Sequence, residues 1–438
     1  MIVAPRIRIA AALVAGAWVV VLAWGMRTSD VKERLRRDIG SAYATESATA
    51  VETNTALRSF SERVTPVMAD LQRGVDEEKA LPEEVRMLCT KVRRGEEPFP
   101  RLPQECHSLL DAHRGAVNTA LTATRARTLD LPRGVDVLSA DYWGAAADGS
   151  LLLLYAAKAG TLDLLRLMTR YQPQRDIGKE FGTSPVDWVA AIDGCLDILA
   201  LGRLLSVSRA FVGLGLANAT IQIPFAACAR ALNDATVVEK HRAQRQLLSL
   251  RDGLRSFDDA LVDETVFNEL AFVRVVLGDA EVSQLPPEAA RLAHRHPSIL
   301  AFWQRWFAPQ ELRELFRERD ALRATADLPA LYRTQALKQI SASAASSWNP
   351  LRRHVEIGAA RFYQRFRHTE AILEALAIGA YADSFRVEHG GWPNATEIAQ
   401  GLPLRSGDLL QFEASDVTFR ITVYGGKEPL SFALTPDS

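Results

Sequence analysis

The most apolar stretch of the chain lies near its start. Eighteen uncharged residues run from Ile9 to Met26, and Arg8 and Arg27 stand on either side of them. At about 1.5 Å rise per residue, such a helix spans about 27 Å, close to the hydrocarbon thickness of a bilayer. The pattern predicts a transmembrane helix, with residues 1–27 as a signal-anchor segment.

A cleaved signal peptide is the alternative for this segment. Its apolar region is usually shorter, and Ala23-Trp24-Gly25 is a poor small-x-small cleavage site. Basic residues precede and follow the span, so charge alone gives a mixed indication of orientation. A short N-terminal tail and a single span favour export of the large part. We therefore expect a single-pass protein of the bacterial inner membrane with its bulk in the periplasm.

Beyond the predicted anchor, the apolar residues are mostly spaced as in amphipathic helices. Residues 28–75 are charged and periodic, residues 104–128 are amphipathic, and Leu- and Ala-rich text begins near residue 148. The pattern predicts a membrane-proximal helical region at 28–130 and a helical domain at 131–365.

Part of this helical text repeats. Residues 156–165 match residues 190–199 at an offset of 34 positions. The match resembles ankyrin repeats, whose implied role is protein binding, but such stacks need about three units and only two are present. Ankyrin-like structure over residues 148–205 is therefore an alternative to a simple helical bundle.

The four cysteines of the chain support export. They form no CxxC pair and no Cys/His cluster, so a zinc site is not expected. An even number fits two disulfides in an oxidising compartment. Three pairings are possible, and the simplest is local, Cys89 with Cys106 and Cys195 with Cys228. Buried free thiols are the alternative.

The pattern changes in the last part of the chain, residues 366–438. His368 to His389 has helical spacing, and Gly390 is suited to end that helix. Alternation of period two then follows around Phe419 to Val423 and Leu430 to Leu434, with Gly425-Gly426 between them as a hairpin. Leu409 to Glu413 supplies a possible third strand. We expect a mainly α chain that ends in a small α+β module with an antiparallel sheet.

Short motifs in this module carry a family resemblance. Ala380-Tyr381 is followed by Glu388-His389-Gly390-Gly391-Trp392-Pro393. This text resembles the soluble domain of type II secretion pseudopilins, over about 70 residues. In that family the helix continues directly from the membrane segment, whereas here roughly 340 residues lie between the two. The resemblance implies a fold but not pilus assembly.

The whole chain also resembles uncharacterised, helix-rich, membrane-anchored envelope proteins of Gram-negative bacteria. That resemblance rests on the helical block from Cys195 to Cys228 and on the terminal module. It implies no known activity.

Composition and motifs narrow the functional classes. The net charge is −1, so no strong field attracts nucleic acid. The motifs GxSxG, HExxH and GxxxxGK[ST] are absent, and Gly213-Leu214-Gly215 is more typical of helix packing than of dinucleotide binding. We expect no cofactor, no metal and no nucleic-acid partner.

One functional cleft is conceivable, at Glu388, His389 and Trp392. Glu388 and His389 could act as an acid–base pair. The simpler interpretation is a cationic His at a helix C-terminus, where it meets the helix dipole. The sequence thus favours a non-enzymatic interaction or scaffold protein of the envelope. The alternatives are a hydrolase with an unrecognised site and a solute-binding or sensor ectodomain.

Overall fold

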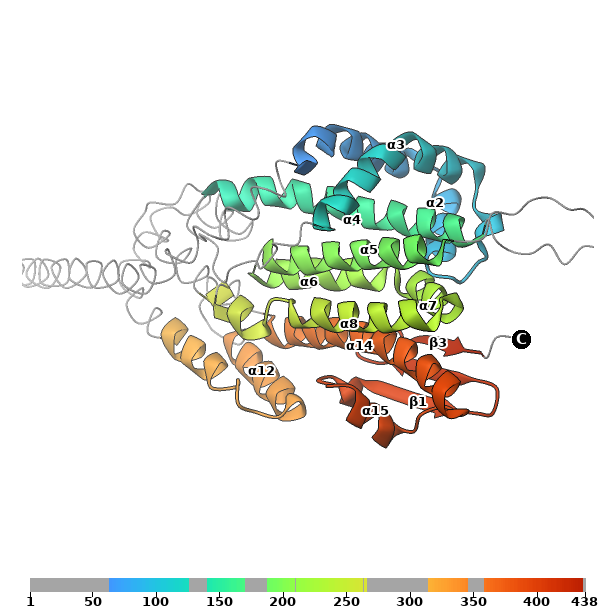
Figure 1. The fold of residues 1–438 in the computed structure, drawn as a ribbon. Coiled ribbons are helices and arrows are strands. Elements are labelled where there is room, and N and C mark those ends of the chain that lie inside the picture. The colour runs from blue at the N-terminus through green and yellow to red at the C-terminus, as the bar shows by residue number, and fades with distance from the viewer. Residues whose placement is uncertain are drawn as a thin grey trace, which may run out of the picture. The chain divides into compact units, whose positions relative to one another are not determined.

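The structure is a computed structural model, and Figure 1 shows its fold. It describes residues 63–125, 140–169, 187–208, 210–262, 264–265, 314–345 and 358–435. Within these ranges the chain is mainly helical with one small antiparallel sheet near its end, as the hydrophobic patterns predict. The expected membrane segment at residues 9–26 lies outside the described ranges. Among the helices that are described, none has both the length and the apolarity needed to cross a bilayer.

The described residues divide into two compact units. The smaller unit contains residues 264–265, 314–345 and Gly358, with α12 (Ala330–Ala345) as its longest described helix. The larger unit contains the remaining described residues, including both disulfides and the sheet.

The larger unit begins with a helix over residues 63–80, followed by α2 (Glu83–Arg93), α3 (Gln104–Thr122) and α4 (Ala140–Thr169). Short 3-10 turns at Phe99–Arg101 and Ala123–Arg125 flank α3. Pro82 and Pro103 stand directly before α2 and α3. Proline is tolerated at the start of a helix because that position needs no N–H donor. Helix α3 packs on α4, as predicted for an amphipathic helix that begins at residue 104.

Four helices follow in the middle of the larger unit: α5 (Trp188–Ser208), α6 (Ala210–Gln222), α7 (Phe225–Asp234) and α8 (Val237–Asp252). The two halves of the 34-residue match lie inside α4 and α5, single helices of 30 and 21 residues. An ankyrin unit instead folds two short helices within about 33 residues. The ankyrin alternative is therefore wrong for these residues.

Gly213 lies where α6 approaches α5 closely. A Cβ atom at this position would lie 2.8 Å from the carbonyl oxygen of Leu205. Only glycine permits this approach without a shift of the backbone. The glycine pair at 213–215 thus serves helix packing, as the sequence favoured.

Both predicted disulfides are present. Cys89 of α2 is bonded to Cys106 of α3, and Cys195 of α5 is bonded to Cys228 of α7. Their Cα atoms are 6.6 Å and 5.4 Å apart. All four sulfur-bearing residues are buried, and none of the described cysteines is free. Each bond joins helices that are close in sequence, as the local pairing predicted.

The C-terminal module is built on α14 (Ala359–His389), which begins earlier than the predicted His368. Then come α15 (Ala395–Gly401), a 3-10 turn at Gly407–Leu409, and the strands β1 (Leu410–Ala414), β2 (Phe419–Val423) and β3 (Leu430–Leu434). The sheet order is β1-β2-β3 and both pairings are antiparallel. The helix end at Gly390 (φ +80°) and the hairpin at Gly425 (φ +101°) both use the left-handed region, as predicted.

Helix α14 is buried on all sides through its middle. Residues 371–380 are all buried, because α6, α7 and α8 cover one side of the helix and β2 covers the other. Nine of these ten residues are uncharged, as expected of a helix in such an interior position, and the tenth is Glu374. The module is therefore part of the main core and not a separate appendage.

The two disulfides should differ in how much they stabilise the larger unit. They close loops of 17 and 33 residues, and loop-entropy arguments give about 3 and about 4 kcal/mol. We expect Cys195→Ala/Cys228→Ala to lower the free energy of unfolding more than Cys89→Ala/Cys106→Ala. Denaturant titration of the full chain in non-reducing detergent solution would measure both. Equal stability of the variants and the parent would contradict the prediction.

Candidate functional site

An open cleft lies between the helix over residues 63–80, α2 and α4. Its volume is about 620 Å³, within the range of small-molecule sites in proteins. Six basic residues line it, Lys79, Arg86, Lys91, Arg93, Arg94 and Lys158, against three acidic residues, Glu78, Glu83 and Glu96. Apolar side chains from the same three helices complete the walls. The cleft is therefore amphipathic, with an excess of positive charge.

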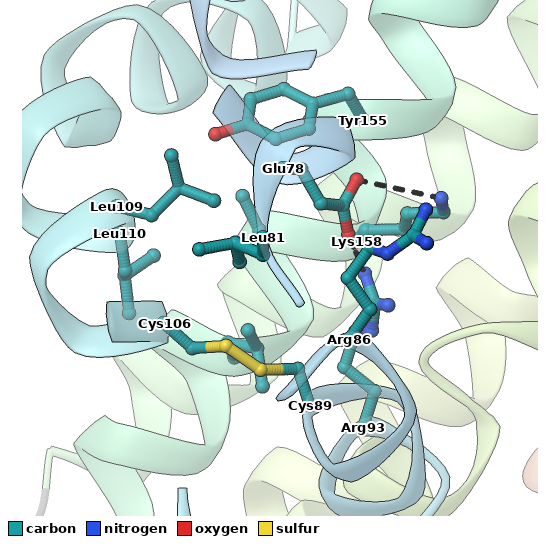
Figure 2. Close-up of a pocket in the computed structure, with 12 residues that line it drawn as sticks. Glu78, Leu81, Arg86, Cys89, Arg93, Cys106, Leu109, Leu110, Tyr155 and Lys158 are labelled. Carbon is teal, nitrogen blue, oxygen red and sulfur yellow. Dashed lines mark hydrogen bonds and ion pairs between the residues drawn. A yellow bond between two sulfur atoms is a disulfide. The ribbon is translucent and has the colours of Figure 1, made fainter. Parts of the chain in front are cut away.

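Glu78 is the centre of the charge arrangement in this cleft. Its carboxylate accepts a hydrogen bond from Arg93 at 3.1 Å and lies 3.6 Å from the ammonium of Lys158, and Figure 2 shows both contacts. Arg93 is only 7% exposed. Burial lowers the pKa of its guanidinium, and the nearby Glu78 opposes that effect. One carboxylate thus serves two cations, which leaves a local surplus of positive charge.

Tyr155 of α4 forms part of the wall. Burial raises the pKa of its hydroxyl, and the charge of Glu78 adds to that effect, so the side chain is a neutral phenol. Its hydroxyl has no hydrogen-bond partner among the described residues. A Cβ atom at Gly74 would lie 2.4 Å from this hydroxyl. Glycine at position 74 therefore allows the ring to lie against the first helix.

The disulfide between Cys89 and Cys106 lines a second, smaller pocket, which Figure 2 shows and which shares Glu78, Arg86, Arg93, Tyr155 and Lys158 with the cleft. The space beside it and Glu78 is small, about 20 Å³, enough for one water molecule. The bond links α2 to α3. It therefore helps to fix the helix that carries Arg86 and Arg93.

A buried histidine fixes the opposite side of the same group of helices. The ring nitrogens of His113 in α3 lie 3.0 Å from Asp70 and 3.0 Å from Glu77 in the first helix. The ring also makes an edge contact with Tyr155. Hydrogen bonds to charged groups contribute about 1.5–3 kcal/mol each. The helices that form the cleft are thus held by polar contacts and a covalent bond.

The residues of the cleft conceived from the sequence lie elsewhere, at the end of α14. Glu388 reaches His241 of α8 at 3.5 Å, and both side chains are substantially exposed. His389 stacks on Phe385 with 4.1 Å between ring centroids.

Trp392, the third of these residues, stacks on Phe419 of β2 at 5.6 Å between ring centroids, and the guanidinium of Arg386 lies over its ring. Glu388, His389 and Trp392 therefore each contact different neighbours.

A second polar cluster is buried between α8, α14 and the loop before β1. Arg251 donates to Glu374 at 2.9 Å, and both side chains are at most 2% exposed. Glu374 also accepts from the backbone N–H groups of Arg405 at 2.7 Å and Ser406 at 3.0 Å. Three parts of the fold, α8, α14 and the loop before β1, thus meet at one carboxylate. The carboxylate oxygens of Glu374 therefore accept hydrogen bonds that hold these parts of the fold together.

A further buried ion pair lies near the other end of the α8–α14 contact. Lys240 of α8 donates to Asp383 of α14 and, at 2.9 Å, to the backbone carbonyl oxygen of Asn233. Lys240 is 2% exposed and Asp383 is 5% exposed. Buried charges are tolerated where they are paired and hydrogen-bonded. Both pairs therefore fix α14 against α8.

Sequence reasoning missed the cationic cleft. Its basic residues come mainly from three helices, and only Arg86, Lys91 and Arg93 of α2, with Arg94 directly after it, are close together in the sequence. That cluster, within nine residues at the C-terminal half of a charged helix, is the only local indication. It is weak, because charge runs are usually solvated faces.

Comparison with known proteins does not assign this chain to a family. Comparisons with protein-family models, with curated proteins and with solved structures gave no match to this chain. The site must therefore be interpreted from its own chemistry.

The buried cluster around Glu374 also contains Glu370 of α14, which lies 3.5 Å from the hydroxyl of Ser406. This cluster predicts that stability depends on pH. Burial, with the adjacent charge of Glu374, raises the pKa of Glu370 to about 7, although Arg367, Arg405 and Arg251 oppose the shift. The folded state therefore binds more protons than the unfolded state between about pH 4.5 and pH 7, and its stability falls as pH rises through that window. We expect Glu370→Gln to remove up to about 3 kcal/mol of this fall.

Denaturant titrations of the full chain from pH 4.5 to pH 8 would measure this dependence. The exposed Glu413→Gln serves as a matched control and should keep the parent slope. A Glu370→Gln protein with the parent's slope would show that another group is responsible.

Proposed function

We propose that this chain is a non-enzymatic interaction or scaffold protein of the bacterial cell envelope. In this proposal residues 9–26 anchor it in the inner membrane, and the helical bulk and the C-terminal module lie in the periplasm. The single observation that carries the proposal is the pair of buried disulfides between neighbouring helices.

Disulfides support export because of where they persist. They form in oxidising compartments such as the periplasm and are rare in the reducing cytosol. Both bonds join core helices, Cys89 to Cys106 and Cys195 to Cys228. An uncharged run of eighteen residues before this unit supplies the membrane attachment that the proposal needs.

The use of the buried charges supports a non-catalytic role. A catalytic carboxylate must reach substrate, whereas Glu374 accepts from Arg251 and two backbone N–H groups, and Asp383 accepts from Lys240. The module resembles pseudopilin domains in its motifs and its helix-plus-sheet layout. We take this only as support for a protein-presenting module, without pilus assembly.

The topology can be tested with two reporters fused after Ser438. Alkaline phosphatase is active only where its own disulfides form, and we expect activity in intact cells. A chain without residues 9–26 is the matched control and should give an inactive reporter. A cytosolic fluorescent reporter should show the opposite pattern. An inactive phosphatase on the full-length fusion would exclude a periplasmic C-terminus.

The interaction role can be tested by purification from detergent-solubilised envelopes of the source cells. We expect one protein to copurify at a fixed ratio through two successive columns. The same procedure on cells that carry an untagged chain controls for non-specific recovery. Repeated isolation of the protein alone would contradict a scaffold role.

A further inference from the structure

We propose that the cleft between the helix over residues 63–80, α2 and α4 binds a small organic acid, a carboxylate or a phosphate ester with an apolar portion. This inference goes beyond the scaffold role and does not depend on the protein partner. It names a binding site and a class of ligand for this chain.

Charge is the first step of the argument. Arg86 lines both the cleft and the small pocket beside the disulfide, and it makes no ion pair with any described residue. Lys158 and Arg93 share the single carboxylate of Glu78. In Figure 2 these four side chains gather on one side of the disulfide. Two or more cations beside one carboxylate leave a position where an anion is electrostatically favoured.

Burial makes this surplus charge energetically significant. The side chain of Arg93 is 9% exposed and that of Lys158 is 34% exposed, so solvent screens them less than it screens surface lysines. A bound anion would neutralise the positive charge of Arg93 and Lys158 that Glu78 alone leaves unbalanced. Arg86, which is exposed at the mouth, can donate two parallel hydrogen bonds to a carboxylate or phosphate.

The apolar wall decides the kind of acid. Met87 is 53% exposed, and it lines the cleft together with Val75 and Leu154. The ring of Tyr155, a neutral phenol, forms part of the same wall. Inorganic phosphate would leave this surface in water, whereas a ligand with an aromatic or aliphatic part would cover it.

The shape favours a small molecule over a flat protein partner. The cleft is concave and holds about 620 Å³, the volume of a small-molecule site. Its walls are fixed by the disulfide between Cys89 and Cys106 and by the contacts of His113 with the first helix. A site that is already ordered loses little entropy when it binds a ligand.

Calorimetric titration of the full chain in non-ionic detergent would test the proposal with three matched probes. These are 2-naphthoate, 1-naphthyl phosphate and the neutral 2-naphthamide. We expect at least one acid to bind saturably with one site per chain, about 10-fold or more tighter than the amide, because a charge-assisted hydrogen bond has that magnitude. The tighter of the two acids identifies the head group. Binding should weaken as salt rises.

Variants separate the cleft from other surfaces. Arg86→Gln/Lys158→Gln should weaken acid binding by about 10-fold or more, while Arg86→Lys keeps the charge but loses the parallel pair of hydrogen bonds and should weaken binding less. Arg101→Gln is the matched control, because Arg101 is exposed and does not line the cleft. Thermal unfolding of each variant checks the fold, and partition of the probes into detergent is the same for all of them.

Three results would overturn the proposal. Equal affinity for the acids and the amide would show that charge plays no part. Unchanged binding to the folded Arg86→Gln/Lys158→Gln protein would place the ligand elsewhere. If neither acid bound saturably, the cleft would not be a binding site for organic acids.

Discussion

The buried ion pair between Arg251 and Glu374 is the constraint on which the rest of the larger unit depends. It joins α8 to α14 where both side chains are shielded from water. Loss of one partner would leave a buried, uncompensated charge, which typically costs about 3–5 kcal/mol. The same carboxylate receives the backbone of Arg405 and Ser406, so the loop before β1 and the sheet take their position from it. A hydrophobic pair at these positions would pack, but it would not fix this loop.

This arrangement explains why the C-terminal module is continuous with the helical core. Its own sheet is small and covers only one face of α14. The opposite face must be covered by α6, α7 and α8 to bury the residues at 371–380. A three-stranded sheet and one helix rarely bury enough apolar area to fold alone. The polar contacts of Glu374 and Asp383 therefore add specificity to a surface that hydrophobic burial already requires.

Local features of the fold could be predicted from the sequence, and long-range ones could not. The end of α14 at Gly390 and both disulfides depend on residues close together in the chain. The partner of Glu374 is 123 residues away, and no periodicity connects it to Arg251. In the sequence, Glu370 and Glu374 interrupt an apolar stripe and look like solvated positions. Only the packing of α8 turns them into buried acids.

The cleft illustrates the same limit for function. Arg86, Lys158 and Glu78 lie on three helices and have no common motif, so their convergence is a product of the fold. The disulfide of α2 to α3 nevertheless gives a physical connection between what the sequence predicts and what it misses. The same bond that indicates an oxidising compartment also fixes the helix that carries Arg86. Reduction of that bond would free α2 at its Cys89 end, and the cations would lose the common orientation that an anion requires. If the chain is exported and binds an anion as proposed, the bond between Cys89 and Cys106 serves both roles.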